Sequence, residues 1–196
     1  MTELLVGFVG APEELVRALD PRHADDARAD FAAYLVATLQ HNQRAGGRFN
    51  PPGEFGALYM ASDEVTAWAE LHARFVREGL PGLPSRMGML RVLLQAGRYV
   101  DLTQAEKREA WHISRDALLA ADPTAVEQND CWLVARAIRA LADFLRAPSA
   151  RADGTNLPLF VQGRRDTELK FDLIAADSAH ETPMHLRQRA AESWDD

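Results

Sequence analysis

The sequence is poor in cysteine and in long apolar runs. Its 196 residues include one cysteine, Cys131, so no disulfide can form within the chain. The apolar surroundings DCWLVARAI predict that this cysteine packs as a small core residue. No apolar run reaches about 18 residues, so we expect no helix that crosses a membrane. The N-terminal stretch lacks a basic start and soon turns acidic, unlike a signal peptide, and we therefore expect a protein of the reducing cytoplasm.

Several motifs that would assign a chemistry directly are also absent. The sequence contains no Gly-x-Gly-x-x-Gly after a strand, no Walker A loop and no Gly-x-Ser-x-Gly elbow. The closest histidine pair, His180 and His185, lies in a polar tail without an evident third ligand, so we expect no metal site. The formal net charge of −7 repels phosphate backbones, so we expect no direct nucleic-acid partner.

The composition that is present suits one globular domain. Apolar residues make up 47% of the chain and charged residues 26%, which is enough apolar material for a core. No linker or repeat divides the sequence, so residues 1–196 are expected to fold as a single domain. Predicted strands and helices mix without regular βαβ alternation, which favours the α+β class over a doubly wound sheet.

Apolar spacing and turn residues predict the individual elements. We expect a short helix over 13–19, one long helix over 25–40, and a helix that is capped by Ser62 and ended by Gly79. Two further helices are expected to begin at capping boxes, one at Thr103 with Glu106 and the other at Thr124 with Glu127. The helix that begins at Thr124 is expected to end at Pro148. The buried face of the helix capped by Ser62 is expected to include Val65, Trp68, Leu71, His72, Phe75 and Val76. The buried face of the helix that ends at Pro148 is expected to include Val134, Ile138, Leu141 and Leu145. The strands expected are 55–61, 89–94, 98–102 and a hairpin of 157–162 with 167–174, while 4–9 is a strand or a buried segment and the tail from 178 is helical or loose.

The stretch from Gly46 to Glu70, GGRFNPPGEFGALYMASDEVTAWAE, carries the candidate chemistry. Two glycines leave the backbone free to bring Arg48 close to a ligand, and a guanidinium offers a planar set of donors for phosphate oxygens. Eleven residues later Tyr59 projects from an expected strand, and eleven residues further Glu70 lies on the following helix.

Each of these residues also has an ordinary structural interpretation. Arg48 is equally typical of a surface arginine, and Tyr59 of a core residue whose hydroxyl bonds to the backbone. On a helical wheel Glu70 points away from the apolar face, so a solvated position paired with Arg74 is its natural interpretation. Small neighbours such as Ala73 would also let a ligand approach, and the wheel leaves both possibilities open.

The ordered set of motifs resembles the RES family, which is named for arginine, glutamate and serine. The matching segments are GGRFNPPG, ALYMA and TAWAE, with VRALDPR upstream and FLRAPSARADGTNLPLF downstream. The upstream segment places the family's early arginine at Arg17, and the downstream segment places its serine at Ser149. The resemblance runs from about Arg17 to about Ile174. Phe49 departs from the family pattern, in which tryptophan is usual at this position.

The resemblance implies a fold and an activity. RES proteins resemble ADP-ribosyltransferase toxins, with a split, mostly antiparallel β core flanked by helices. They are usually toxins that attack NAD as substrate, without a separate cofactor, and their partner is an Xre-type helix-turn-helix antitoxin. The roles implied are charge stabilisation at the ribose by Glu70, stacking on nicotinamide by Tyr59, binding of the diphosphate by Arg48 and Arg17, and a hydrogen bond near the ribose from Ser149.

Several functions remain open from the sequence. Cleavage of the nicotinamide–ribose bond by water or by phosphate depletes free NAD, whereas the same site could transfer ADP-ribose to a protein. A module that binds without catalysis, with Arg48 and Glu70 in structural ion pairs, belongs to another class. An RNA-cleaving toxin is disfavoured by the acidic charge and by the absence of a histidine pair near Arg48.

Overall fold

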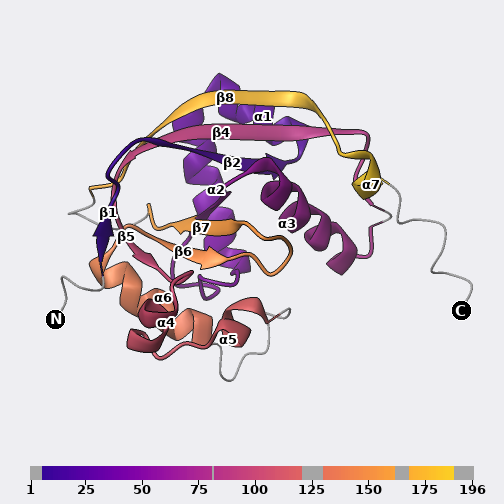
Figure 1. Ribbon diagram of the computed structural model, residues 1–196. Coiled ribbons are helices and arrows are strands. Elements are labelled where there is room, and N and C mark those ends of the chain that lie inside the picture. Colours follow the sequence, from indigo (N-terminus) through magenta and orange to yellow (C-terminus); the bar gives the residue numbers. More distant parts are fainter. Residues whose placement is uncertain (1–5, 81, 121–129, 162–167, 188–196) are drawn as a thin grey trace, which may run out of the picture.

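A computed structural model describes residues 6–80, 82–120, 130–161 and 168–187 of the chain. In these residues the elements follow in the order β1 (Gly7–Phe8), β2 (Glu13–Leu19), α1 (Pro21–Ala29), α2 (Phe31–Ala45), β3 (Leu58–Ala61), α3 (Glu64–Arg77), β4 (Arg86–Ala96), β5 (Arg98–Asp101), α4 (Ala105–Ala110), α5 (Arg115–Leu119), α6 (Asp130–Leu141), β6 (Phe144–Pro148), β7 (Thr155–Leu159), β8 (Lys170–Glu181) and α7 (Met184–Arg187). Figure 1 shows their arrangement.

The described strands join one mixed sheet in the order β1-β5-β6-β7-β3-β2-β4-β8. Neighbouring strands run antiparallel except β5 and β6, which are parallel. The mostly antiparallel α+β class that the sequence and its family resemblance predict is therefore confirmed.

The sheet divides between β2 and β3. Strand β2 pairs with β4 along its full length, from Glu13 opposite Leu94 to Leu19 opposite Gly88. It meets β3 only at Val16 opposite Ala61. Strands β8, β4 and β2 thus form one half and β3, β7, β6, β5 and β1 the other. In Figure 1, β8, β4 and β2 lie together above β7 and β6. The split β core expected from the family is confirmed.

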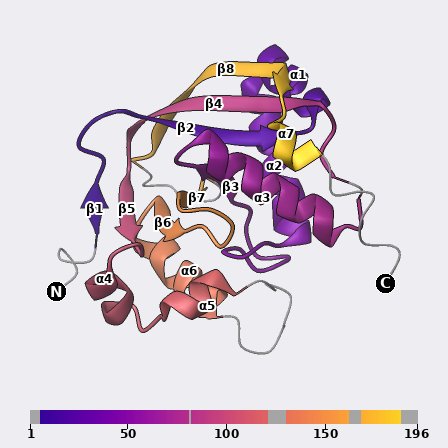
Figure 2. The ribbon, with the colours of Figure 1, turned by 45° about the vertical axis from the view of Figure 1, so that its right-hand side comes forward.

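Three buried clusters hold the helices to the two halves. One lies under α1 and α2 and includes Leu15, Leu58 and Leu90. A second joins α5 and α6 to β5 and β6, at the bottom of both views in Figures 1 and 2. The third packs α3 against β2 and β4 around Trp68. Burial of this apolar surface is the main driving force for these contacts.

Residues 13–19 form strand β2, and the short helix predicted there is wrong. Leu15 and Leu19 pack toward α1 and α2, whereas Val16 and Ala18 pack toward α3. Two buried faces with period two suit a central strand, and pairing with β4 overrides the local helical spacing.

Other predicted boundaries are corrected by caps and by packing. The long helix over 25–40 is two helices, because Asp30 ends α1 and its side chain accepts a hydrogen bond from Ala33 N, which caps α2. Helix α3 is capped by Asp63 instead of Ser62. Helix α4 begins at Ala105, and its N-cap residue Gln104 forms no side-chain cap, so the Thr103 box does not form. The Thr124 box lies outside the described residues.

The buried faces of helices α3 and α6 and the hairpin expected over 157–174 also differ from the sequence prediction. On α3, Val65 and Val76 are 71% and 49% exposed. Helix α6 ends at Leu141, so Leu145 lies in strand β6 instead of on a helix that continues to Pro148. Strand β7 pairs with β3 and β6 while β8 pairs with β4, so no 157–174 hairpin exists in the described chain. Such partners are set by long-range packing, which local spacing does not reveal.

A glycine substitution tests the contact between α2 and the segment before β3. A Cβ on Gly56 would lie 2.1 Å from the backbone oxygen of Leu39. We expect Gly56→Ala to lower the free energy of unfolding by about 1–3 kcal/mol, because the backbone must shift. Gly10→Ala is the matched control, since nothing lies within 4 Å of its Cβ. Equal urea midpoints for the two variants would contradict the close packing described here.

Candidate active site

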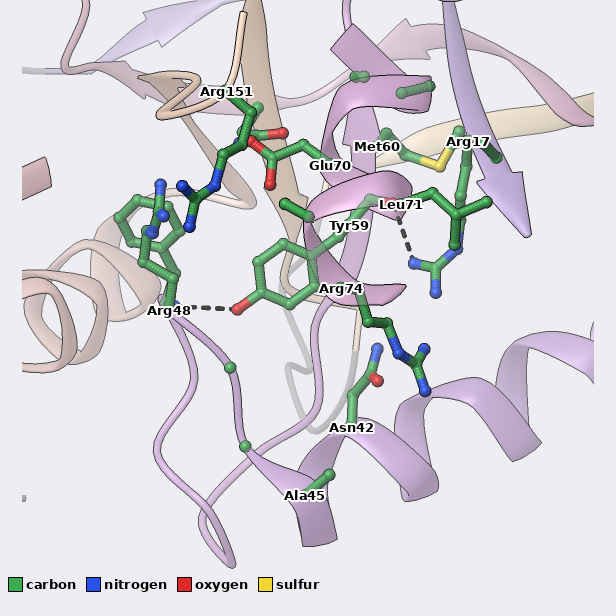
Figure 3. Close-up of a pocket in the computed structure, with 18 of the residues that line it drawn as sticks. Arg17, Asn42, Ala45, Arg48, Tyr59, Met60, Glu70, Leu71, Arg74 and Arg151 are labelled. Atoms are coloured by element: carbon green, nitrogen blue, oxygen red, sulfur yellow. Dashed lines mark hydrogen bonds between the residues drawn. The ribbon is translucent and has the colours of Figure 1, made fainter. Parts of the chain in front are cut away.

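A cavity of about 490 Å³ opens where β2 and β3 part. Its size falls within the range of small-molecule sites. It lies between the end of α2, the following glycine loop, β3 and α3, with contributions from α6 and β7. The polar lining residues include Arg17, His41, Asn42, Arg48, Tyr59, Glu70, Arg74, Arg77, Glu78, Trp132, Arg151 and Asn156. Figure 3 shows many of these side chains around one space.

Four of the five residues singled out from the sequence line this cavity. Arg17, Arg48, Tyr59 and Glu70 come from β2, the glycine loop, β3 and α3 respectively. Ser149 does not line it but contacts Glu70 from behind. The structure therefore brings together residues that are far apart in the chain, which is the geometric requirement that a shared site imposes.

The hydroxyl of Tyr59 fixes the loop that carries Arg48. Phe49 N donates to Tyr59 Oη at 2.9 Å, and Tyr59 Oη donates to Asn50 Oδ1 at 2.7 Å. A Cβ on Gly47 would come within 2.7 Å of both side-chain oxygens, so only glycine fits there. Burial raises the pKa of the Tyr59 hydroxyl well above its ordinary value, so this group stays protonated.

Asn50 completes the loop from its other end. It is fully buried, and its Nδ2 donates to the backbone oxygens of Asn42 and Phe55 at 2.7 and 3.1 Å. The asparagine of GGRFNPPG thus ties the loop to α2 and to the turn before β3. Sequence reasoning missed this residue, although its place between a glycine pair and a proline pair was a usable signal.

Glu70 is held by neutral donors on one oxygen. Ser149 Oγ and Asn156 Nδ2 both donate to Glu70 Oε1, each at 2.7 Å. Arg74 instead forms its ion pair with Glu78 at 2.8 Å, so the expected Glu70–Arg74 pair is wrong. No described residue bonds to Oε2 of Glu70, which leaves the second oxygen open to a ligand in the cavity.

The partners of Glu70 are themselves fixed. Ser149 Oγ accepts from the backbone N–H groups of Arg151 and Ala152 at 3.0 and 3.2 Å. Asn156 lies on β7 and is 92% buried, with a relative exposure of 8%. The sequence analysis missed Asn156, because only the pairing of β7 with β3 brings it beneath α3.

The two arginines expected to bind an anion retain unused donors. Arg17 Nη1 donates to the backbone oxygen of Tyr59 at 2.9 Å, so this side chain bridges β2 and β3 where the backbone ladder is missing. Arg48 Nη2 reaches the backbone oxygen of Ala120 at 3.4 Å. Arg17 Nε and Arg48 Nη1 are buried without a hydrogen-bond partner among the described residues. Buried donors of this kind are normally satisfied, and a bound anion would satisfy them.

Other sequence predictions can be placed in the same structure. Cys131 is 3% exposed and packs in the core, as predicted, and burial raises the pKa of its thiol to about 11. In the described part of the chain, no cluster of three or more His, Cys, Asp or Glu residues could hold a metal ion. The described helices include none long and apolar enough to cross a membrane. In the same residues neither Arg48 nor Glu70 forms an ion pair, which argues against the purely structural interpretation of both.

These features define an α+β protein with a split antiparallel sheet and an arginine-lined cavity that holds one anchored carboxylate. The chain belongs to the RES domain family, whose model matches residues 15–184. It is 32% identical over 136 residues to a protein of Mycobacterium tuberculosis (strain ATCC 25618 / H37Rv) named "Probable NAD(+) phosphorylase". The aligned region covers 68% of this chain and 62% of that protein. The chain thus spans less than two thirds of that relative.

A solved structure supports the fold. The M. tuberculosis MbcT-MbcA toxin-antitoxin complex contains a chain that superposes with a TM-score of 0.59 at 19% identity. The match covers 86% of this chain and 87% of the other. At this identity the likeness concerns the arrangement of helices and strands.

Removing one hydroxyl tests the loop anchor. We expect Tyr59→Phe to lower the free energy of unfolding by about 1–3 kcal/mol, because it leaves Phe49 N and the buried Asn50 Oδ1 without their partner. Tyr34→Phe is the matched control, since Tyr34 is also buried but its hydroxyl bonds to no described residue. Equal unfolding midpoints for the two variants would show that the Tyr59 hydroxyl does not hold the loop.

Proposed function

We propose that this protein cleaves NAD at the bond between nicotinamide and ribose. The observation that carries the proposal is Glu70, a carboxylate with one oxygen anchored and the other open, in a cavity whose arginines have unused donors. Such a set suits a substrate that has an anionic diphosphate at one end and a sugar that becomes cationic at the other.

The chemistry needs few groups. As the glycosidic bond breaks, positive charge builds on the ribose, as in glycoside hydrolysis. Nicotinamide leaves as a neutral ring, so no strong general acid is required. A fixed carboxylate beside the ribose stabilises the developing charge without reorganising, and such preorganised stabilisation is usually the largest single contribution to catalysis. Glu70 fills this role because Ser149 and Asn156 fix its direction.

The remaining residues orient the substrate. Arg17 and Arg48 offer buried N–H donors for the diphosphate oxygens. The Tyr59 ring stacks on nicotinamide while its hydroxyl is occupied by the loop. Ser149 serves the ribose indirectly through Glu70. NAD is thus a substrate, and the reaction needs no separate cofactor.

The family and the relatives also support a proposal for the biological role. We infer that loss of NAD makes this protein a toxin, and that an antitoxin of the Xre helix-turn-helix type neutralises it in the cytoplasm. The support is membership of the RES family, a relative named as an NAD(+) phosphorylase and a structural neighbour from a toxin-antitoxin complex. Transfer of ADP-ribose to a protein is the competing outcome, and labelled NAD separates the two, since transfer leaves label on protein.

Removing the charge of Glu70 tests the proposal. We expect Glu70→Gln to lower kcat for NAD cleavage by about 10²–10³, the usual effect of losing one preorganised group. Nicotinamide release by the purified protein is the measurement, and cellular NAD after brief expression is a second readout. Glu106→Gln, an exposed glutamate of α4 outside the cavity, is the charge-matched control. Unchanged turnover in Glu70→Gln would end the proposal.

The anchors of Glu70 provide a separate prediction. We expect Asn156→Ala and Ser149→Ala each to lower kcat by roughly tenfold, while KM for NAD changes less, because the carboxylate loses its direction but remains in place. The double variant should lose less than the product of the two effects, since both donors bind the same oxygen. Full kcat in both single variants, with only lower thermal stability, would assign them a structural role.

A further inference from the structure

The cavity carries more positive charge than the diphosphate of NAD requires. Its lining includes two carboxylates, Glu70 and Glu78, against five arginines, namely Arg17, Arg48, Arg74, Arg77 and Arg151. In a chain of net charge −7, this gathering of arginines at one cleft is a local reversal of charge. NAD itself has a small net charge, because its positive nicotinamide ring offsets one of the two negative charges of the diphosphate. A substrate with further negative charge would match this lining better.

Helix α3 presents the carboxylate and two of these arginines on one face. Glu70, Arg74 and Arg77 follow one another at helical spacing, and all three line the cavity. Arg77 lies seven residues beyond Glu70 in the sequence, which is about 10 Å along the helix axis. This length is comparable to the separation of the two riboses that a diphosphate joins. With Glu70 at the ribose that loses nicotinamide, Arg77 lies near the level of the other ribose.

The other side chains of the cavity agree with this direction. In Figure 3, Arg48 lies on one side of the Tyr59 ring, and the Glu70 side chain extends toward that side. The guanidiniums of Arg17 and Arg74 lie on the other side. A diphosphate held by both Arg48 and Arg17 therefore passes the ring, and the adenosine beyond it lies toward the C-terminal end of α3.

Arg74 and Arg77 retain unused donors at this end. No described residue forms a hydrogen bond or ion pair with the side chain of Arg77. Arg74 donates to Glu78 through Nε at 2.8 Å, and neither of its terminal nitrogens has a partner among the described residues. The last turn of a helix favours a cation with or without a ligand, so the position of Arg77 alone decides nothing. A ligand is indicated because both guanidiniums line one cavity, at the end where the adenosine ribose would lie.

The 2′ position of the adenosine ribose distinguishes NAD from NADP. Rossmann sites for NAD offer the 2′ hydroxyl a carboxylate, whereas those for NADP place an arginine near the 2′-phosphate, and the same chemistry applies in other folds. Here Glu78, the carboxylate at this end of the cavity, is already bonded to Arg74. A phosphate monoester adds about −1.5 to −2 charge at pH 7 and presents three acceptor oxygens, which suits two guanidiniums with free donors.

We propose that this protein cleaves NADP as well as NAD, and that Arg74 and Arg77 hold the 2′-phosphate. This inference rests on the proposed cleavage of NAD and extends it to the phosphorylated substrate. The bond that breaks is the same C1′–N bond, and its electron pair goes to the nicotinamide nitrogen. With water as the acceptor, its oxygen forms the new bond to C1′ and one proton goes to solvent. The products are then 2′-phospho-ADP-ribose and nicotinamide.

The test is nicotinamide release by the purified full chain, measured over a range of NADP and, separately, of NAD. We expect KM for NADP to be roughly three- to tenfold lower than KM for NAD at low ionic strength, a modest factor because both arginines are exposed to solvent. Added salt should reduce the difference, since it screens exposed charges. Adenosine 2′,5′-bisphosphate should inhibit NAD cleavage more strongly than 5′-AMP, which reports on the subsite without turnover of NADP.

Two variants with opposite effects on charge assign the subsite. Arg77→Ala should raise KM for NADP roughly threefold or more and KM for NAD much less, because only NADP has an anion at this position. Glu78→Gln removes the carboxylate bonded to Arg74 and should lower KM for NADP. Arg44→Ala removes an exposed arginine of α2 that does not line the cavity, so it controls for net charge and should leave both KM values unchanged.

The outcomes separate this inference from the function on which it rests. Cleavage of NAD alone, or a KM for NADP equal to or above that for NAD, would overturn the 2′-phosphate subsite and leave the proposed function intact. Equal rises of both KM values in Arg77→Ala would overturn it too, because Arg77 would then act on the diphosphate or on the helix end. No cleavage of either dinucleotide would overturn the proposed function itself.

Discussion

The parting of β2 from β3 is the constraint on which the site depends. A sheet with a full ladder at this position would have no space between these strands, and its backbone groups would be satisfied by each other. Here the strands share only Val16 opposite Ala61, and Arg17 donates its side chain to the carbonyl of Tyr59 across the gap. The opening that results is the cavity, and the residue that bridges it is one of its cationic walls.

Around that opening, Tyr59 and Glu70 are held in place by neighbouring groups that take no part in the proposed reaction. The Tyr59 hydroxyl is occupied by Phe49 N and Asn50, which leaves the ring to face the cavity. Glu70 is bonded on one oxygen and open on the other. Rigid support of this kind keeps catalytic groups within the small tolerance that electrostatic stabilisation demands. Ser149, which bonds to Glu70, is in turn held by the backbone N–H of Arg151.

Much of the candidate site could be predicted from one continuous stretch of sequence. Gly47 admits the close approach of Tyr59, and the spacing from Arg48 to Glu70 spans one loop, one strand and one helix in the expected order. The environment of Glu70 could not be predicted, because its wheel position is equally typical of a solvated face. What distinguishes it is Asn156, which belongs to a strand 86 residues further along the chain. Pairing of β7 with β3 is a long-range choice that local spacing does not encode.

The sequence by itself determined the α+β class, the turn-rich loop at Gly46 and Gly47 and the burial of Cys131, because these depend on local residue chemistry and spacing. Resemblance of the sequence to the RES family supplied the set of residues from Arg17 to Ser149. Only the tertiary structure decided that residues 13–19 are a strand, where the sheet splits, and which groups hold Glu70. These depend on which distant segments share a buried surface, and burial acts on the folded chain as a whole.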